Sequence, residues 1–398
     1  MTGAAAPEEP SRIAGLYELA MRRHQAGELR AAEELYRAIL AADPRQLDCL
    51  NFLGLIALQE NRPQAAAELI DQAIAANDGI AAYHVTIAQA HRALGEPEKA
   101  VAHLRKAVSL EGGDWAAHAR LADLLREAGD LDGAAGHYRK ATELNPGLAA
   151  ARHNLAAVLL DQGHANEALD AAARALAARD DAGTRDLFLQ SLRNADRLPA
   201  FPEFRRQLIR ALREAWAPPA EFANAAIAII TSEPTIARGI QTAMMSWPRR
   251  LSPQEIGQAM GVMAADELLQ ALLNATAVTH PGLQRLLTSA RTILLDAAAQ
   301  ANSDISREMI DLACALACQS VLNDYAFDVS DAEREALAWL RNTVRTALGG
   351  RAPVFALHVI ALAAYAPLRA LDRDQALLGR SWPAPLQHLI AQQLQPAA

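Results

Sequence analysis

One turn residue recurs at a fixed interval through the first half of this 398-residue chain. Each occurrence is a glycine or an asparagine, the residues that most readily adopt a positive φ after the end of a helix. The series is Gly27, Asn61, Gly95, Gly129 and Gly163, with steps of 34 residues. A fixed interval of this length indicates one helix-turn-helix unit that is made five times.

The residues that helix packing requires keep the same interval. A small residue recurs in the second helix of each unit, where only a small side chain lets two helices approach closely. These residues are Ala32, Ala66, Ala100, Ala134 and Ala168. The first helix repeats an apolar residue followed by a small one, at Leu19-Ala20, Leu53-Gly54, Ile87-Ala88, Leu121-Ala122 and Leu155-Ala156. Because these classes agree, the sequence predicts an all-α solenoid.

The position classes resemble the tetratricopeptide-repeat (TPR) family over about residues 13–182. The tryptophan that is usual near the start of each repeat is absent, and its equivalents are Leu50, His84, His118 and Arg152. Residues 183–196 predict one further helix of the first type, which would cover the last apolar face. We expect residues 11–198 to form the solenoid, and residues 1–10 to be disordered.

The TPR resemblance implies that a peptide or an extended protein segment binds the concave face, which the first helix of each repeat mainly lines. The 34-residue interval places thirteen candidate residues on this face. They are Tyr17, Met21, His24, Asp48, Asn51, Leu55, Leu58, Val85, Gln89, Arg92, Asp123, Arg126 and His153. These candidates are apolar toward the N-terminal end and charged toward the middle.

Arg92 and Arg126 occupy the same position in successive repeats. Equivalent helices lie roughly 10 Å apart, so two guanidinium groups in one groove are candidates to hold a carboxylate or an acidic segment. The alternative is that each arginine forms surface salt bridges with acidic neighbours such as Asp123, Glu127 or Asp161. The lysines of the family's two-carboxylate clamp are missing, so a chaperone C-terminus is not the expected ligand.

Five histidines of the array raise the question of a metal site: His84, His91, His118, His137 and His153. His84 and His91 are seven residues apart, so they lie two turns apart on one helix face. No close pair of histidine and carboxylate completes a site. His84 and His118 also occupy a packing position of the repeat. We therefore expect structural roles for the histidines and no bound metal.

After Leu198-Pro199 the 34-residue interval stops, and the rest of the chain still has helical patterns. Apolar spacings of three and four predict nine helices, over 203–215, 221–231, 252–260, 265–277, 281–300, 304–324, 331–348, 353–365 and 384–394. No segment shows the period-two alternation of a strand. We expect a separate, compact all-α domain over residues 199–398.

Segments 269–295, 313–327 and 363–389 resemble the helical region that lies between the TPR array and the methyltransferase domain in some bacterial TPR-methyltransferases. In that family a Rossmann-like S-adenosylmethionine domain follows, and the sequence here ends where that domain would begin. No glycine-rich loop of the kind that cradles a nucleotide occurs in the chain. The resemblance implies a stand-alone accessory part that acts beside a separately encoded enzyme.

Composition and cysteine usage exclude several classes of function. The formal net charge is −8 and no long Lys/Arg block occurs, so we expect no nucleic-acid partner. Three cysteines are too few for a disulfide framework, which favours the cytoplasm. The longest apolar run, Val354 to Leu368, is shorter than a membrane-spanning helix needs. Cys314 and Cys318 lie on one helix face among apolar neighbours, which favours core packing over a metal site.

No catalytic or cofactor-binding motif occurs in the sequence, so we expect neither a catalytic residue nor a cofactor. The leading hypothesis is a non-catalytic adaptor, in which the solenoid holds a protein or peptide client. The helical domain would dock a partner enzyme or associate with itself. Two alternatives remain open: a subunit of a peptide-modifying enzyme with a site in the helical domain, and a structural scaffold.

Overall fold

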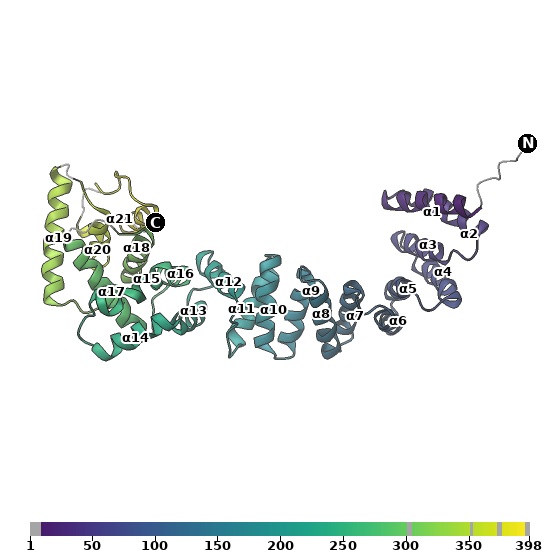
Figure 1. Ribbon diagram of the computed structural model, residues 1–398, viewed down its shortest axis with the longest axis horizontal. Coiled ribbons are helices and arrows are strands. Elements are labelled where there is room, and N and C mark those ends of the chain that lie inside the picture. Colours follow the sequence, from purple (N-terminus) through teal and green to yellow (C-terminus); the bar gives the residue numbers. More distant parts are fainter. Residues whose placement is uncertain (1–8, 301–304, 351–352, 372–375, 395–398) are drawn as a thin grey trace, which may run out of the picture. The chain divides into compact units, whose positions relative to one another are not determined.

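A computed structural model describes residues 9–300, 305–350, 353–371 and 376–394. The described residues form helices and no strand, in the order that Figure 1 shows. The chain divides into two compact units, Met1–Pro199 and Ala200–Ala398. Of the segment expected to be disordered, residues 1–8 lie outside the described residues, and the first helix begins at Glu9.

The first unit consists of paired antiparallel helices followed by one unpaired helix. Its helices are α1 (Glu9–Gln25), α2 (Leu29–Ala42), α3 (Leu47–Gln59), α4 (Pro63–Ala76), α5 (Ala81–Ala93), α6 (Pro97–Leu110), α7 (Trp115–Glu127), α8 (Leu131–Leu144), α9 (Ala149–Asp161), α10 (Ala165–Ala178) and α11 (Ala182–Asn194). Each first helix from α3 to α9 packs on the second helix of its own repeat and on that of the preceding repeat, and α1 packs on α2. The last helix, α11, packs on α10.

The turn residues have the backbone conformation that the sequence predicts. Gly27, Gly95, Gly129 and Gly163 have φ between 74° and 81°, and Asn61 has φ 57°. The following amide closes the helix end in each turn, as where Glu96 N donates to the His91 carbonyl oxygen over 2.9 Å. The repeated chain reversal therefore depends on one residue per repeat that tolerates positive φ.

The expected small residues lie at the closest helix contacts. All five alanines of the second helices are fully buried, and so are Ala20, Ala122 and Ala156 of the first helices. At Gly54, an added Cβ would lie 2.6 Å from Ile70 Cγ1, so α3 and α4 approach too closely there for any larger residue. Close packing of small residues thus sets the spacing of the two helices in a repeat.

The second unit has ten α-helices and one 3₁₀ helix among the described residues. They are α12 (Pro202–Arg213), α13 (Ala220–Ser232), α14 (Pro234–Ser246), α15 (Pro253–Ala265), α16 (Glu267–Ala275), α17 (Pro281–Ala299), α18 (Arg307–Leu322), α19 (Asp331–Gly350), α20 (Ala356–Ala363), η1 (Leu368–Ala370) and α21 (Ala384–Leu394). Helices α17 and α18 lie at its centre: α17 contacts α14, α19 and α20, and α18 contacts α15, α16, α20 and α21.

Helix α14 was not among the nine helices predicted for this half, so that prediction was wrong. Gly239 lies in the middle of α14 and weakens its helical signal. The structure requires this glycine, because a Cβ there would lie 2.9 Å from Ala259 Cβ of α15. The signal that marks the helix is its start, where Pro234 occupies the first turn and the Glu233 carboxylate accepts a hydrogen bond from Ile236 N over 2.6 Å.

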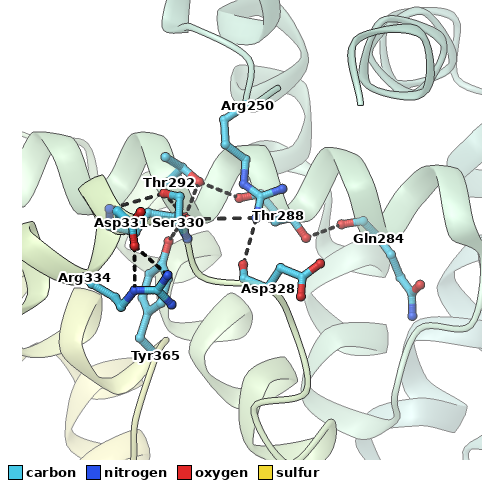
Figure 2. A network of polar contacts seen from close by, with 10 residues as sticks. Arg250, Gln284, Thr288, Thr292, Asp328, Ser330, Asp331, Arg334 and Tyr365 are labelled. Atoms are coloured by element: carbon cyan, nitrogen blue, oxygen red, sulfur yellow. Dashed lines mark hydrogen bonds and ion pairs between the residues drawn. The ribbon is translucent and has the colours of Figure 1, made fainter. Parts of the chain in front are cut away.

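A buried carboxylate joins three segments of the second unit. Glu333 of α19 is 3% exposed. Its carboxylate accepts hydrogen bonds from Ser330 N (2.8 Å) and Oγ (2.7 Å), from Thr292 Oγ1 of α17 (2.7 Å), and from Tyr365 Oη (2.8 Å). Figure 2 shows Ser330, Thr292 and Tyr365 converging from different elements.

Among the described residues, no helix is long and apolar enough to cross a membrane.

Candidate functional site

The thirteen candidate residues lie on the first helices of the repeats, from α1 to α9. Helix α3 packs on α5, and side chains join α1 to α3, α5 to α7 and α7 to α9, so these helices line one side of the array. All the candidates are half-buried or exposed except Asn51, which is 7% exposed. The structure therefore brings the candidates onto a shared surface.

Aromatic side chains cluster at the N-terminal end of this surface. Phe52 stacks on Tyr36, with ring centroids 5.3 Å apart and planes within 9°. Tyr17 and His24 pack edge-on against both rings, at 6.0 to 6.4 Å. Met21 Sδ accepts a hydrogen bond from the Tyr36 hydroxyl over 3.4 Å. Phe52 was not among the candidates, although aromatic residues are scarce in the chain and two others, Tyr36 and Tyr83, fall within one repeat of it.

A cavity of about 630 Å³ opens beside the aromatic cluster, between α1 and the turn before α3. Its wall includes Tyr17, Ile13, Gln46 and the carboxylates Asp43 and Asp48. Hydrogen bonds from Arg45 N and Gln46 hold the pKa of Asp43 below its ordinary value, so it is charged at neutral pH. This end of the surface thus combines apolar rings with negative charge.

Polar contacts link the first helices of consecutive repeats. Tyr83 Oη donates to Asp48 Oδ1 (2.7 Å), and Asn154 Nδ2 donates to Asp123 Oδ1 (3.2 Å). Arg92 Nη2 donates to Glu127 Oε1 (2.6 Å), and His153 Nδ1 lies 2.9 Å from Thr184 Oγ1. The salt-bridge alternative is therefore confirmed for Arg92. Asp48, Arg92, Asp123 and His153 have contacts within the array itself.

Apart from the three candidates of α1 and the buried Asn51, the rest of the candidates form an accessible strip. We define this strip as Leu55 and Leu58 of α3, Val85 and Gln89 of α5, and Arg126 of α7. The first four side chains are half-buried and that of Arg126 is exposed. Arg126 lies near the Tyr138 hydroxyl, which donates a short hydrogen bond to Asp123. The strip offers apolar side chains, one amide and one cation over three consecutive repeats.

The histidines form two equivalent pairs within the third and fourth repeats. His84 Nδ1 lies 3.1 Å from His103 Nδ1, and His118 Nδ1 lies 2.9 Å from His137 Nδ1. His84 Nε2 also lies 2.9 Å from the carbonyl oxygen of Asp78, which can only accept, so Nε2 carries a proton and Nδ1 of the neutral ring is an acceptor. His103 must then donate from its own Nδ1. His91 also stacks on His103, with ring centroids 5.4 Å apart. Of the described residues, no group of three or more His, Cys, Asp or Glu side chains is arranged so that it could hold a metal ion.

The geometry of paired helices, positive-φ turns and small packing residues corresponds to one known repeat. The family model described as tetratricopeptide repeat matches residues 17–79 and 85–149. These residues are tetratricopeptide repeats. TPR proteins in general mediate interactions between proteins. Both matched ranges lie in the first unit, so the methyltransferase-associated resemblance of the second half stays a prediction.

Solved structures similar to the chain include TPR proteins. One is the crystal structure of MamA, whose sequence is 21% identical to this chain. The match covers 42% of this chain and 91% of MamA, with a TM-score of 0.38. YrrB, described as a TPR protein with an unusual peptide-binding site, is 21% identical, with 45% and 89% covered and a TM-score of 0.37. A comparison with curated proteins gives no match.

Outside the TPR array, the two neighbouring cysteines of α18 lie in the wall of a second cavity. This cavity has a volume of about 500 Å³, and its wall also includes Asp311 and His388. Burial raises the pKa of Cys314 well above its ordinary value and raises that of Cys318 to about 11. Both thiols are therefore protonated at neutral pH, whereas a nucleophile or metal ligand needs the thiolate.

Proposed function

We propose that the TPR unit binds an extended peptide segment of a client protein along the strip, and that the chain acts as an adaptor. The observation that supports this proposal is that some candidates on the first helices contact the next repeat and others do not. Asp48, Asp123 and His153 hold consecutive repeats together, while the strip stays accessible beside them. An accessible line of apolar, amide and cationic groups on a rigid array suits a peptide in extended conformation.

The strip also suggests what kind of peptide would bind. Leu55, Leu58 and Val85 offer contacts for apolar side chains, and the Gln89 amide can both donate to and accept from a peptide backbone. Arg126 supplies positive charge at the end of the strip. Arg92 is already neutralised by Glu127, so we expect it to attract an acidic side chain less strongly than Arg126 does. The preferred ligand is thus apolar, followed by an acidic residue.

Introducing charge into the apolar part of the strip is expected to abolish most of the binding. A peptide selected on the purified chain from an unbiased library would be titrated by fluorescence anisotropy. We expect Leu55→Glu combined with Val85→Glu to weaken it at least about tenfold, because a central apolar contact contributes about 1–2 kcal/mol. The matched control is Leu144→Glu, at an exposed apolar residue on the end of α8. Equal loss in the control would contradict binding on the strip.

The two equivalent arginines are expected to differ in their effect. Arg126→Glu should weaken an acidic peptide several-fold and Arg92→Glu less, because Glu127 already screens Arg92. Both variants should fold, since an exposed ion pair such as Arg92–Glu127 contributes at most about 1 kcal/mol. Anisotropy titrations of the two single variants test this order. A larger effect of Arg92→Glu, or none from either, would show that Arg126 does not face the ligand.

We further propose that the second unit docks a separately encoded modifying enzyme, as its resemblance to the TPR-methyltransferase region implies. The competing role, an enzyme subunit with its own cofactor site, makes a different prediction. Under the adaptor proposal, titration of S-adenosylmethionine into the isolated chain should give no binding heat in isothermal calorimetry. Micromolar binding would favour the enzyme subunit instead.

A further inference from the structure

A buried arginine of the second unit lacks the partners that its charge requires. Arg291 of α17 is 5% exposed, and its guanidinium lies over the Phe327 ring with Cζ 4.1 Å from the centroid. Its Nε and Nη1 atoms have no hydrogen-bond partner among the residues that the structure describes. Buried polar groups are nearly always paired, and a buried charge without a partner is strongly unfavourable.

The nearest buried carboxylate does not supply this partner. The Glu333 oxygens accept four hydrogen bonds from Ser330, Thr292 and Tyr365, all neutral donors. The cation closest to Glu333 is Arg250, at 3.9 Å, and Figure 2 shows Arg250 also reaching the Asp328 backbone, whose carbonyl oxygen it contacts at 2.8 Å. Burial lowers the pKa of Arg291 to about 10, so it is still charged at neutral pH.

Arg291 lies in the wall of a cavity of about 290 Å³. This volume is at the lower end of the range for small-molecule sites. The wall also holds Arg285, Trp247 and the neutral polar side chains Gln284, Thr288, Gln319 and Asn323. Asp328 is the single carboxylate in the wall, against two arginines, and its side chain is exposed. The cavity therefore has a net cationic wall, and its free donors are those of the arginine Arg291.

An aromatic side chain borders the same cavity. Two guanidinium groups lie over the Trp247 ring. Arg250 Cζ is 5.0 Å from the ring centroid, and Arg285 Cζ is 5.1 Å from it. Val278 and Leu287 add apolar wall. A ligand in this space would meet cations at one part of its surface and flat or apolar groups at another.

We propose that this cavity binds a small organic anion, whose carboxylate or phosphoryl group is held by Arg291 and Arg285 and whose body packs against Trp247. A planar guanidinium offers paired donors that match the oxygens of either group. The site is independent of the peptide strip, because it lies wholly within the second unit. Arg291 is a binding residue in this proposal, and the unbound chain tolerates its incomplete pairing.

Calorimetric titration of the full chain tests the site and separates the two anion classes. The probes are inorganic phosphate, phenyl phosphate, acetate and benzoate, each against sodium chloride at matched ionic strength and pH 7.5. We expect saturable binding of benzoate or phenyl phosphate, with the corresponding small anion at least tenfold weaker because it lacks the body that packs on Trp247. The melting temperature should rise by about 3 °C at ten times the dissociation constant.

Replacing Arg291 by methionine distinguishes a binding residue from a structural one. Methionine keeps much of the shape and removes the charge, so the unbound Arg291→Met chain should melt no lower than the parent while losing anion binding at least tenfold. Arg285→Met gives a second reading at a less buried position, and Arg341→Met, at an exposed arginine of α19, should change neither quantity. No saturable binding of any probe, equal binding by all variants, or a lower melting temperature of Arg291→Met with unchanged binding would each overturn the proposal.

Discussion

Replacing Glu333 by alanine is expected to lower the free energy of unfolding of the second unit by about 3–5 kcal/mol, because it removes the acceptor of a buried charged network. The change leaves the buried Tyr365 hydroxyl without its acceptor, and it removes the contacts of the half-buried Thr292 and the exposed Ser330. It also removes the carboxylate nearest to Arg250. Differential scanning calorimetry of the full chain measures the effect. The transition of the TPR unit should stay where it is.

The matched control lies on the same helix. Glu335 is two residues away from Glu333 on α19 and is exposed. Glu335→Ala should change the unfolding free energy by no more than about 0.5 kcal/mol, as surface substitutions usually do. If the two alanine variants melted alike, the Glu333 network would not be a source of stability.

The same network predicts an acid-labile contribution to stability. Burial acts to raise the pKa of Glu333, but the hydrogen bonds from Ser330, Thr292 and Tyr365 outweigh it and hold the pKa below its ordinary value. A carboxyl group with a lowered folded pKa stabilises the native state above its unfolded pKa, which is about 4.3. That contribution is lost as the pH falls below this value and through the folded pKa. In urea unfolding, the parent and Glu333→Ala should therefore differ less in their free energies of unfolding at pH 4 than at neutral pH.

The sequence predicts much more of the structure of the first unit than of the second. In the first, every structural role repeats every 34 residues, so the positive-φ turns at Gly27 and Asn61 and the buried alanines follow from the interval alone. In the second, only local signals are available. The pairing of Ser330 with Glu333 marks a helix start, but nothing local indicates that Thr292 and Tyr365 complete it from 41 and 32 residues away.

The candidate site shows the same limit within the repeats. The interval places the thirteen candidates on the first helices, but it does not tell which of them face a ligand and which face the next repeat. That choice depends on partners such as Tyr83, which reaches Asp48 across 35 residues. Likewise, the spacing of His84 gives its packing position, whereas its contact with His103 depends on how the two helices of one repeat are rotated.

The two histidine pairs predict that the TPR unit loses stability as the pH falls below about 6.5. Burial lowers the pKa values of His103 and His137, and the facing histidines lower them further. A histidine with a lowered folded pKa binds fewer protons in the native than in the unfolded state, whose value is about 6.5. Stability is thus complete above that pH and declines as the pH falls toward the folded pKa. Urea unfolding of the TPR unit between pH 5.5 and 7.5 measures the slope.

The chain itself supplies the variant that should remove this slope. The positions equivalent to His84 and His103 in the preceding repeat are Leu50 and Leu69, so the repeat already accommodates an apolar pair there. Replacing both histidine pairs by leucines should be nearly neutral at pH 7.5, since both polar partners leave together, and should flatten the pH dependence. His103→Leu alone removes the proton that His84 Nδ1 accepts and should cost about 1–3 kcal/mol.

An exposed histidine of the same unit provides the control for titration in general. His164, which lies before α10, is exposed, and His164→Leu should leave the slope between pH 5.5 and 7.5 unchanged. A slope that survived in the four-leucine variant would mean that the pH dependence arises from other groups. The acidic groups that act on the paired histidines are Asp71, which raises the pKa of His103, and Asp130, which raises that of His137. Because a second proton would place two Nδ1–H groups against each other at about 3 Å, each pair can take up at most one extra proton without separating its two helices.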